Sequence, residues 1–180
     1  DCRLDEAFRD YELASRLAEL MHEQVLSDIA LWQAQGLQVL PGAINVAPVE
    51  FLRDDFAEKL LDKLHRFEVD PALVELEVTE QVLTDRGSAF VARALGVLKA
   101  AGVRIALDDF GTGHSSLAHL RDYPIDVLKI DRSFVARMVA EPSIRSIVEA
   151  VAKLAISLQL ELVAEGVENR GQREMLLDAG

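Results

Sequence analysis

The sequence has little cysteine, no long apolar run and fewer basic than acidic residues. Its one cysteine, Cys2, cannot form an internal disulfide, and no apolar run approaches the roughly 18 residues of a transmembrane span. The 19 lysines and arginines against 31 aspartates and glutamates give a formal charge of -12, which argues against binding to the phosphate backbone of a nucleic acid polymer. We therefore expect a cytoplasmic segment without membrane contact, in which a cation bridges any phosphate ligand.

The length and the ends of the chain predict one domain that is part of a longer protein. The 180 residues, half of them hydrophobic, can bury a sizeable core. No signal peptide is visible, but the chain opens on Asp1 rather than Met and stops at Gly180 within a helical pattern. We therefore expect residues 1–180 to be a fragment of a domain.

Helical and strand patterns alternate along the whole chain without a linker or a repeat. Apolar periodicity predicts helices at 11–35, 48–66, 88–101 and 143–159, and Gly36 and Gly102 are typical of positions just past a helix end. Short apolar runs at 43–47, 73–78, 103–109, 126–131 and 160–167 are typical of buried parallel strands. This alternation predicts an α/β fold with a parallel sheet, either a barrel or an open doubly wound sheet.

Polar residues gather at the carboxyl ends of these predicted strands, where parallel α/β folds place their active sites. Within 126–131, strand alternation puts Lys129 and Asp131 on one face. Single acidic residues in such places are often helix caps or solvated loop charges, and Lys129 could merely extend its amine to solvent or pair with Asp131. The set comprises Asn45, Glu77, Glu80, Asp108, Asp109, Lys129, Asp131, Glu165 and Glu168.

The adjacent carboxylates of Asp108 and Asp109 predict a divalent cation. Two ionised carboxylates about 4 Å apart repel by roughly 4 kcal/mol at an effective dielectric of about 20, so a compensating charge is expected. Zinc is disfavoured because no Cys/His ligand spacing is present, and His22, His65 and His119 are predicted to be surface residues of helices. Oxygen donors suit Mg²⁺ or Mn²⁺. The glycines after Asp109 match neither the Walker nor the dinucleotide-binding fingerprint and could form an ordinary turn.

Five motifs together resemble the EAL-domain phosphodiesterases of bacterial second-messenger signalling, which hydrolyse cyclic di-GMP to linear pGpG. The motifs are N-V-A at Asn45, E-V-T-E from Glu77, DDFGTGHSSL from Asp108, LKIDRSFV from Leu128 and VAEGVEN from Val163. The resemblance implies a modified TIM-type (β/α)8 barrel, of which this chain would hold five of about eight strand–helix units. It also implies two Mg²⁺ or Mn²⁺ ions, cyclic di-GMP as substrate, a homodimer as one assembly, and fusion to sensory or GGDEF domains. Such domains could anchor the whole protein to a membrane.

The resemblance also assigns roles by position. It implies a catalytic set of Lys129, Glu165 and Asp131, in which Lys129 orients or deprotonates the attacking water. The implied metal ligands are Asn45, Glu77, Asp108, Asp109 and Glu165, with Asp108 bridging both ions. Glu80 and Glu168 resemble carboxylates that stabilise the substrate loop, formed by Phe110, Gly111, Thr112, Gly113, His114 and Ser115.

The chain departs from the family pattern at both ends. It lacks the Glu-Ala-Leu strand that carries a further metal ligand, and the closing Gln-Gly-Tyr stretch. An inactive EAL domain that acts as a cyclic di-GMP receptor or scaffold is therefore the alternative function. A third reading, from chemistry alone, is a barrel lyase or aldolase that uses Lys129 as a Schiff base.

Overall fold

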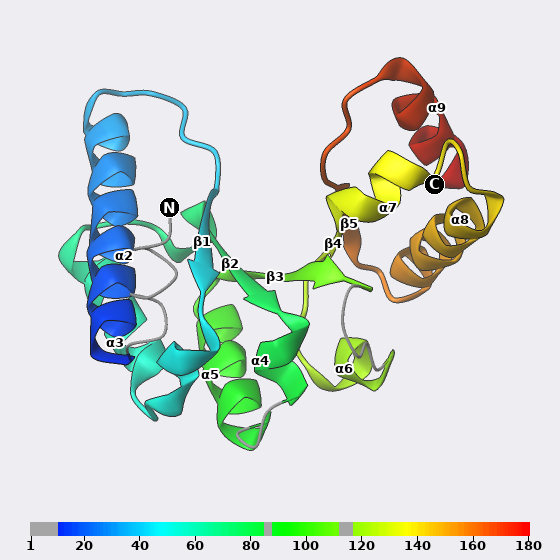
Figure 1. Cartoon of the computed structure of the whole chain (residues 1–180). Coiled ribbons are helices and arrows are strands. Elements are labelled where there is room, and N and C mark those ends of the chain that lie inside the picture. Colours follow the sequence, from blue (N-terminus) through cyan, green and yellow to red (C-terminus); the bar gives the residue numbers. More distant parts are fainter. Residues whose placement is uncertain (1–10, 85–87, 112–116) are drawn as a thin grey trace. The chain divides into compact units, whose positions relative to one another are not determined.

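The computed structural model describes residues 11–84, 88–111 and 117–180 (Figure 1). The chain divides into two compact units, Asp1–Ile105 and Ala106–Gly180, each with its own strands and helices. Across the described ranges, no helix combines the length and the apolar character that crossing a bilayer requires.

The first unit pairs two parallel strands with helices from either side of them in the chain. Its elements are α2 (Tyr11–Ala34), β1 (Gly42–Val46), the 3-10 helix η1 (Pro48–Leu52), α3 (Phe56–Arg66), the 3-10 helix η2 (Pro71–Leu73), β2 (Val74–Thr79), α4 (Glu80–Thr84) and α5 (Ser88–Ala100). β1 and β2 run parallel, with Asn45 opposite Glu77. Fully buried leucines from several elements form the core: Leu26 of α2, Leu60 and Leu64 of α3, Leu76 of β2, and Leu95 and Leu98 of α5.

The predicted ends of two helices in this unit are confirmed. α2 and α5 each end within a residue of the predicted boundary. Gly36 and Gly102 follow them with φ values of 72° and 106°. Glycine adopts this left-handed backbone without a steric penalty, which is why it ends helices so often.

The single helix predicted over 48–66 is wrong, because the chain breaks between η1 and α3. Arg53 is extended, with φ -104° and ψ 122°, so the helical hydrogen-bond ladder stops there. The rings of Phe51 and Phe56 then pack together across the break, with centroids 4.8 Å apart. Both phenylalanines are buried, so the break places two aromatic side chains in the core that a continuous helix would space differently.

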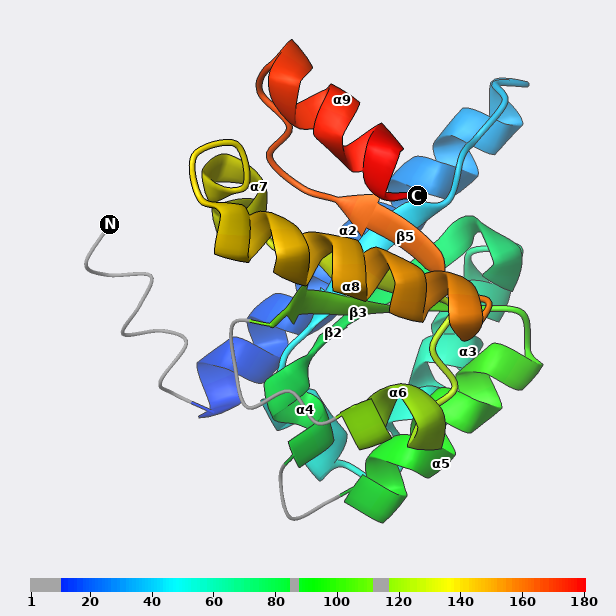
Figure 2. The ribbon, with the colours of Figure 1, turned by 90° about the vertical axis from the view of Figure 1, so that its right-hand side faces the viewer.

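The second unit contains three parallel strands in sequential order. β3 (Arg104–Phe110) starts at the end of the first unit, and its paired residues lie in the second. There follow α6 (Leu117–Asp122), β4 (Val127–Ile130), α7 (Arg132–Arg137), α8 (Pro142–Ser157), β5 (Glu161–Ala164) and α9 (Arg170–Ala179). β4 pairs with both β3 and β5. Figures 1 and 2 both show α8 beside α9.

The core of the second unit lies where β4 meets α7 and α8. Ile130, Val135, Met138 and Val148 are buried together, and Leu162 of β5 packs against them. β5 is shorter than the predicted strand 160–167, because Gly166 has a φ of 67° and turns the chain. Parallel strands alternating with helices in both units confirm the predicted α/β class.

Candidate metal centre

The carboxyl end of β3 brings two adjacent aspartates to one place. Regular strand alternation would point Asp108 and Asp109 to opposite faces. Here the register between β3 and β4 shifts between Leu107 and Phe110, and Asp109 has a φ of 54°. As a result, Asp108, Asp109 and Glu165 each offer a carboxylate oxygen, and these oxygens lie within 4.8 Å of one another. An irregular strand end of this kind often redirects a side chain next to a functional site.

Lys129 of β4 lies against this cluster. Its Nζ is 2.6 Å from Glu165 Oε1 and 3.2 Å from Asp108 Oδ1, and the residue is only 8% exposed. A lysine this buried is rare unless it is paired, and here two carboxylates surround it. The lysine therefore compensates part of the negative charge of the cluster.

The charged form of Asp109 is destabilised by its surroundings in this cluster. Burial raises the pKa of its carboxyl group, and the neighbouring charges of Asp108, Asp131 and Glu165 raise it further. Its backbone N–H donates to Asp108 Oδ1 at 3.0 Å, which holds the first carboxylate in position. A cation at this point would reverse the electrostatic cost of the two charges.

Asp131 has a structural contact of its own. It is the N-cap of α7, because its Oδ1 accepts from the backbone N–H of Ser133 at 3.0 Å and from the Ser133 hydroxyl group. The hydroxyl hydrogen bond is the largest cause of the lowered pKa of Asp131. The helix-cap alternative is therefore confirmed for this residue, and its charge still reaches Asp109.

The turn after β5 fixes the position of Glu165. Its backbone N–H donates to the carbonyl group of Ile130 at 3.0 Å, which continues the pairing of β4 with β5. The next residue, Gly166, packs so closely that a Cβ built there would lie 2.7 Å from Cβ of Arg132. This turn thus packs the chain segment after β5 against Arg132, the residue next to Asp131.

In the first unit, Asn45 and Glu77 form a separate pair of candidate oxygen ligands. They lie opposite each other on β1 and β2, so their side chains project from the same face of the two strands. Asn45 is exposed and Glu77 is buried. The predicted carboxyl-end positions of these residues are therefore confirmed within this unit.

The residues expected at the substrate loop fall partly outside the described residues. Phe110 ends β3 and is buried, and Gly111 follows with a φ of 93°. Glu80 is buried at the first residue of α4. Glu168 is exposed, and its backbone N–H donates to Gln172 Oε1 at 2.7 Å. Thr112, Gly113, His114 and Ser115 lie outside the described residues.

One histidine expected at the surface is buried instead. His22 is 5% exposed, and burial is the largest cause that lowers its pKa to about 4. Its ring hydrogen-bonds the backbone of Asn45, and its Nε2 lies 3.6 Å from Glu50 Oε1. The periodic positions of the buried Leu26 and Ile29, four and seven residues later, are the signal that could have revealed it. His65 is exposed as expected, and the side chain of His119 is outside the described residues.

The donor set of the second unit fits a hard divalent cation. All three candidate ligand residues, Asp108, Asp109 and Glu165, offer carboxylate oxygens. Mg²⁺ and Mn²⁺ prefer such ligands, whereas zinc sites are built mainly from histidine and cysteine.

Comparison with known protein families gives one match that covers almost the entire chain. The sequence model of the EAL domain matches residues 2–180. Among curated proteins, the signaling protein YkoW of Bacillus subtilis is 36% identical over 158 residues, which are 88% of this chain and 20% of YkoW. The chain also aligns with a bifunctional diguanylate cyclase/cyclic di-GMP phosphodiesterase, MucR of Pseudomonas aeruginosa, at 34% identity over 93% of this chain and 24% of MucR. It thus spans about a fifth of the length of these relatives.

Solved structures agree with the sequence matches. The MucR phosphodiesterase in complex with cyclic di-GMP superposes with a TM-score of 0.88 at 32% identity, over 96% of this chain and 70% of that chain. The EAL domain of Mycobacterium smegmatis DcpA gives a TM-score of 0.84 at 37% identity, over 93% of this chain and 75% of that chain. These matches confirm the predicted EAL-type barrel class, of which the chain covers a part.

Proposed function

This chain belongs to the EAL domain family, and on that premise we propose that it hydrolyses cyclic di-GMP to linear pGpG with the help of Mg²⁺ or Mn²⁺. The observation that carries the proposal is the group of three carboxylates with Lys129 in direct contact. The solved structure of MucR, a relative named as a phosphodiesterase, supports cyclic di-GMP as the ligand.

Asp108, Asp109 and Glu165 are the proposed metal ligands of the second unit, and Asn45 and Glu77 those of the first. Asp108 is the proposed bridging ligand, and its Oδ1 atom is held in place by Lys129 Nζ at 3.2 Å and by the N–H of Asp109 at 3.0 Å. When bound, the metal ions would lower the pKa of a water molecule and neutralise the phosphate group. That chemistry would let an acidic protein bind an anionic substrate.

Lys129 is the proposed residue that holds the attacking water and receives its proton. Its amino group lies against Asp108 and Glu165, two of the proposed metal ligands, so its position is fixed relative to the reacting centre. To accept a proton, this group would have to be the neutral amine, a form that bound metal cations nearby would favour. Asp131 would assist by positioning the start of α7 through its hydrogen bonds to Ser133. Glu165 would then serve both as a ligand and as the residue that orients Lys129.

The substrate loop, Phe110 to Ser115, is proposed to contact the nucleotide, with Glu80 and Glu168 stabilising it. The relatives are about four times as long as this chain, so we also propose further domains, sensory or GGDEF, in the whole protein. We also propose a cytoplasmic location for the EAL domain and a homodimer as its assembly.

The test compares two variants of the centre. Asp108→Asn is expected to lose Mn²⁺ binding and hydrolysis together, because it removes a charged ligand. Lys129→Met is expected to keep cyclic di-GMP affinity and to lower turnover about 100-fold or more, as expected when a positioned proton acceptor is lost. Lys153→Met, at an exposed position of α8, is the matched control.

Hydrolysis is measured by separating cyclic di-GMP from pGpG, and binding by calorimetry. Equal turnover with a chelator and with Mn²⁺ would refute a metal-dependent reaction. If the wild-type chain binds cyclic di-GMP but releases no pGpG with either metal, the receptor or scaffold function replaces the proposal. Reductive trapping of a substrate on Lys129 would instead support the Schiff-base alternative.

A further inference from the structure

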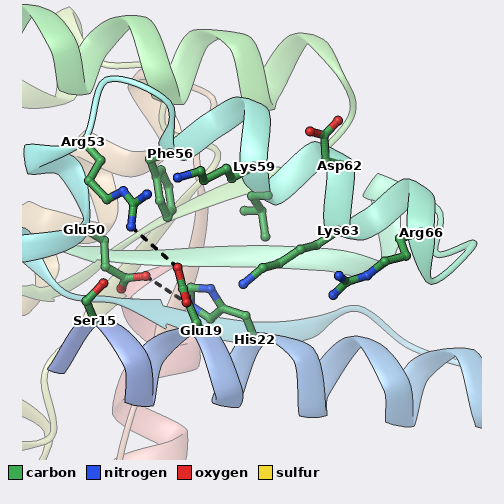
Figure 3. A pocket seen from close by; sticks show the side chains of 11 residues that line it. Ser15, Glu19, His22, Glu50, Arg53, Phe56, Lys59, Asp62, Lys63 and Arg66 are labelled. Carbon is green, nitrogen blue, oxygen red and sulfur yellow. Dashed lines mark ion pairs between the residues drawn. The ribbon is translucent and has the colours of Figure 1, made fainter. Parts of the chain in front are cut away.

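A cavity of about 260 Å³ lies between α2, η1 and α3 in the first unit (Figure 3). Lys59 and Lys63 extend from α3 into it, Arg53 enters after the end of η1, and Arg66 lies at the last turn of α3. None of these residues belongs to the proposed catalytic machinery.

The cavity concentrates positive charge in a chain with a formal charge of -12. Four cationic side chains line it, together with the carboxylates of Glu19, Glu50 and Asp62. Three of the four cations form ion pairs with carboxylates. The N···O distances are 3.7 Å for Arg53 and Glu19, 2.7 Å for Lys59 and Asp55, and 2.6 Å for Arg66 and Glu23.

Lys63 is the fourth cation of the cavity. It is half-buried, and Figure 3 shows its amine directed toward His22. Lys63 makes no ion pair with any residue in the described part of the chain. The carboxylates of Glu23 and Glu50 are near enough to interact with its charge but do not pair with it. A cation that faces a cavity without a direct ion pair is suited to an anion from solution.

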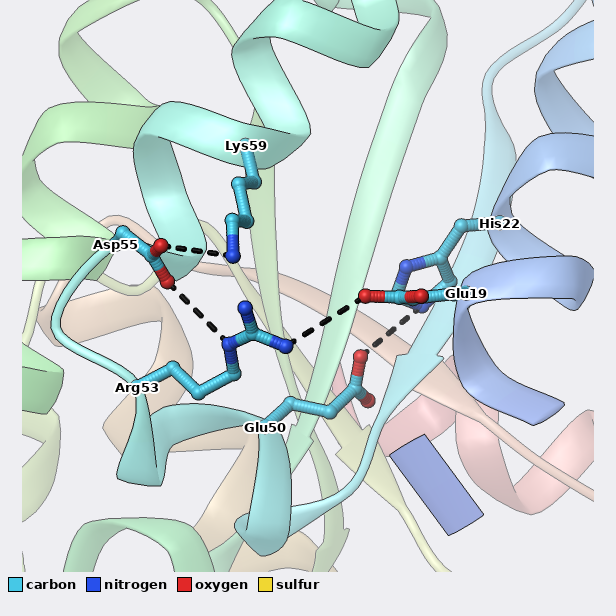
Figure 4. A network of polar contacts seen from close by, with 6 residues as sticks. All are labelled: Glu19, His22, Glu50, Arg53, Asp55 and Lys59. Atoms are coloured by element: carbon cyan, nitrogen blue, oxygen red, sulfur yellow. Dashed lines mark hydrogen bonds and ion pairs between the residues drawn. The ribbon is translucent and has the colours of Figure 1, made fainter. Parts of the chain in front are cut away.

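The floor of the cavity consists of two buried groups that the proposed chemistry does not use (Figure 4). The Nε2 atom of His22 lies 3.6 Å from Glu50 Oε1 and has no hydrogen-bond partner among the described residues. Glu50 is 7% exposed, and burial raises the pKa of its carboxyl group to about 7. At neutral pH, Glu50 is therefore partly protonated and opposes an anion less than a carboxylate with an ordinary pKa would.

We infer that this cavity binds a small molecule in which a phosphoryl group is attached to an apolar body. Lys63 provides a charge-assisted donor that recognises a phosphoryl group. Arg53 and Lys59 line the same cavity, and each has further N–H donors beyond those in its ion pairs. Phe56 and Leu60 line the same cavity and offer apolar contact. The volume lies just below the usual range of small-molecule pockets, about 300–1,000 Å³, which selects for a ligand of one ring.

The cavity is also connected to a proposed metal ligand of the first unit. The ring of His22 hydrogen-bonds the backbone of Asn45, a proposed ligand in the same unit. The side chain of His22 therefore links a ligand in the cavity to the backbone of β1. An effect of this ligand on catalysis rests on the proposed function. Binding of the ligand in the cavity does not, because it needs neither the metal nor cyclic di-GMP.

The test is calorimetry with phenyl phosphate as the probe, in the presence of a chelator so that divalent ions cannot bind it. Saturable binding at one site is expected. Lys63→Gln should weaken it about tenfold or more, because it removes one charge-assisted contact, and Lys63→Arg should retain most of the affinity. The control Lys153→Gln makes the same charge change on an exposed helix position and should leave binding unchanged. Circular dichroism of each variant confirms that it is folded.

A second readout locates the ligand. In ¹H–¹⁵N spectra, phenyl phosphate should shift the amides of α3 and of Asn45. Binding that Lys63→Gln and Lys153→Gln weaken equally, or no saturation at millimolar probe, would overturn the inference. So would shifts confined to the second unit. If the wild-type chain does not hydrolyse cyclic di-GMP in a separate assay with metal, that result counts against the proposed function alone. The binding experiment contains no metal and is not affected by it.

Discussion

Replacing Glu50 by glutamine should remove a pH-dependent loss of stability. The pKa of this buried carboxyl group is raised from 4.5 to about 7, with burial as the largest cause. Glu19 and His22 face it from α2, and Lys63 from α3. A raised folded-state pKa means that the folded chain favours the protonated group. Its stabilising contribution is therefore complete below about pH 4.5 and is lost as the pH rises through about 7.

The size of this effect follows from the two pKa values. The difference of about 2.5 pH units, at about 1.4 kcal/mol each, amounts to about 3 kcal/mol of unfolding free energy lost above pH 7. Glutamine has the shape of the protonated group, and its side-chain oxygen can still accept from the N–H of Ala47, as Glu50 Oε2 does at 2.9 Å. The variant should therefore keep the local structure of η1 without the cost of a buried charge.

Urea unfolding at pH 5 and pH 8, followed by the emission of the single tryptophan, Trp32, measures this difference. The advantage of Glu50→Gln over the wild type should grow by about 2–3 kcal/mol between the two pH values. His22 lies 3.6 Å from Glu50 Oε1, so the measured difference reports the titration of Glu50 together with its coupling to His22. Glu58→Gln, at an exposed position of α3, is the control and should show no such growth. Equal stability differences at pH 5 and pH 8 would refute the burial argument.

Three further substitutions test two glycine positions and one helix cap. Gly166→Ala should destabilise the second unit by about 1–3 kcal/mol, because φ is 67° and the new Cβ would lie 2.7 Å from that of Arg132. Gly96→Ala within α5, where a Cβ meets nothing within 4 Å, should instead stabilise the chain by about 0.5–1 kcal/mol, and urea unfolding that ranks the two in the opposite order would contradict both. Asn169→Ala should cost about 1 kcal/mol in the same assay, because Asn169 Oδ1 accepts from Gln172 N–H at 3.0 Å at the start of α9; an unchanged midpoint would show that the cap adds nothing.

The order of the secondary structure follows from local sequence. α2 and α5 end at the predicted glycines, because a left-handed turn there depends on one residue and not on distant contacts. The helix over 48–66 could not be predicted in its two parts, since the break depends on the packing of Phe51 against Phe56. By contrast, the burial of His22 could have been predicted, because Leu26 and Ile29 follow it at helical spacing on the buried side of α2.

For the candidate site, the sequence by itself determined which residues are candidates for the chemistry. Acidic residues at the ends of apolar runs, together with the motifs around them, indicate the family and the oxygen-rich donor set, because composition and spacing are local properties. The tertiary structure decided how these groups meet. Strand alternation separates Asp108 from Asp109, and only the register shift and the left-handed Asp109 bring both carboxylates to Glu165. Likewise, alternation placed Lys129 beside Asp131, whereas in three dimensions Lys129 contacts Asp108 and Glu165 and Asp131 caps α7, because pairing between strands, and not their sequence, sets which charges are neighbours.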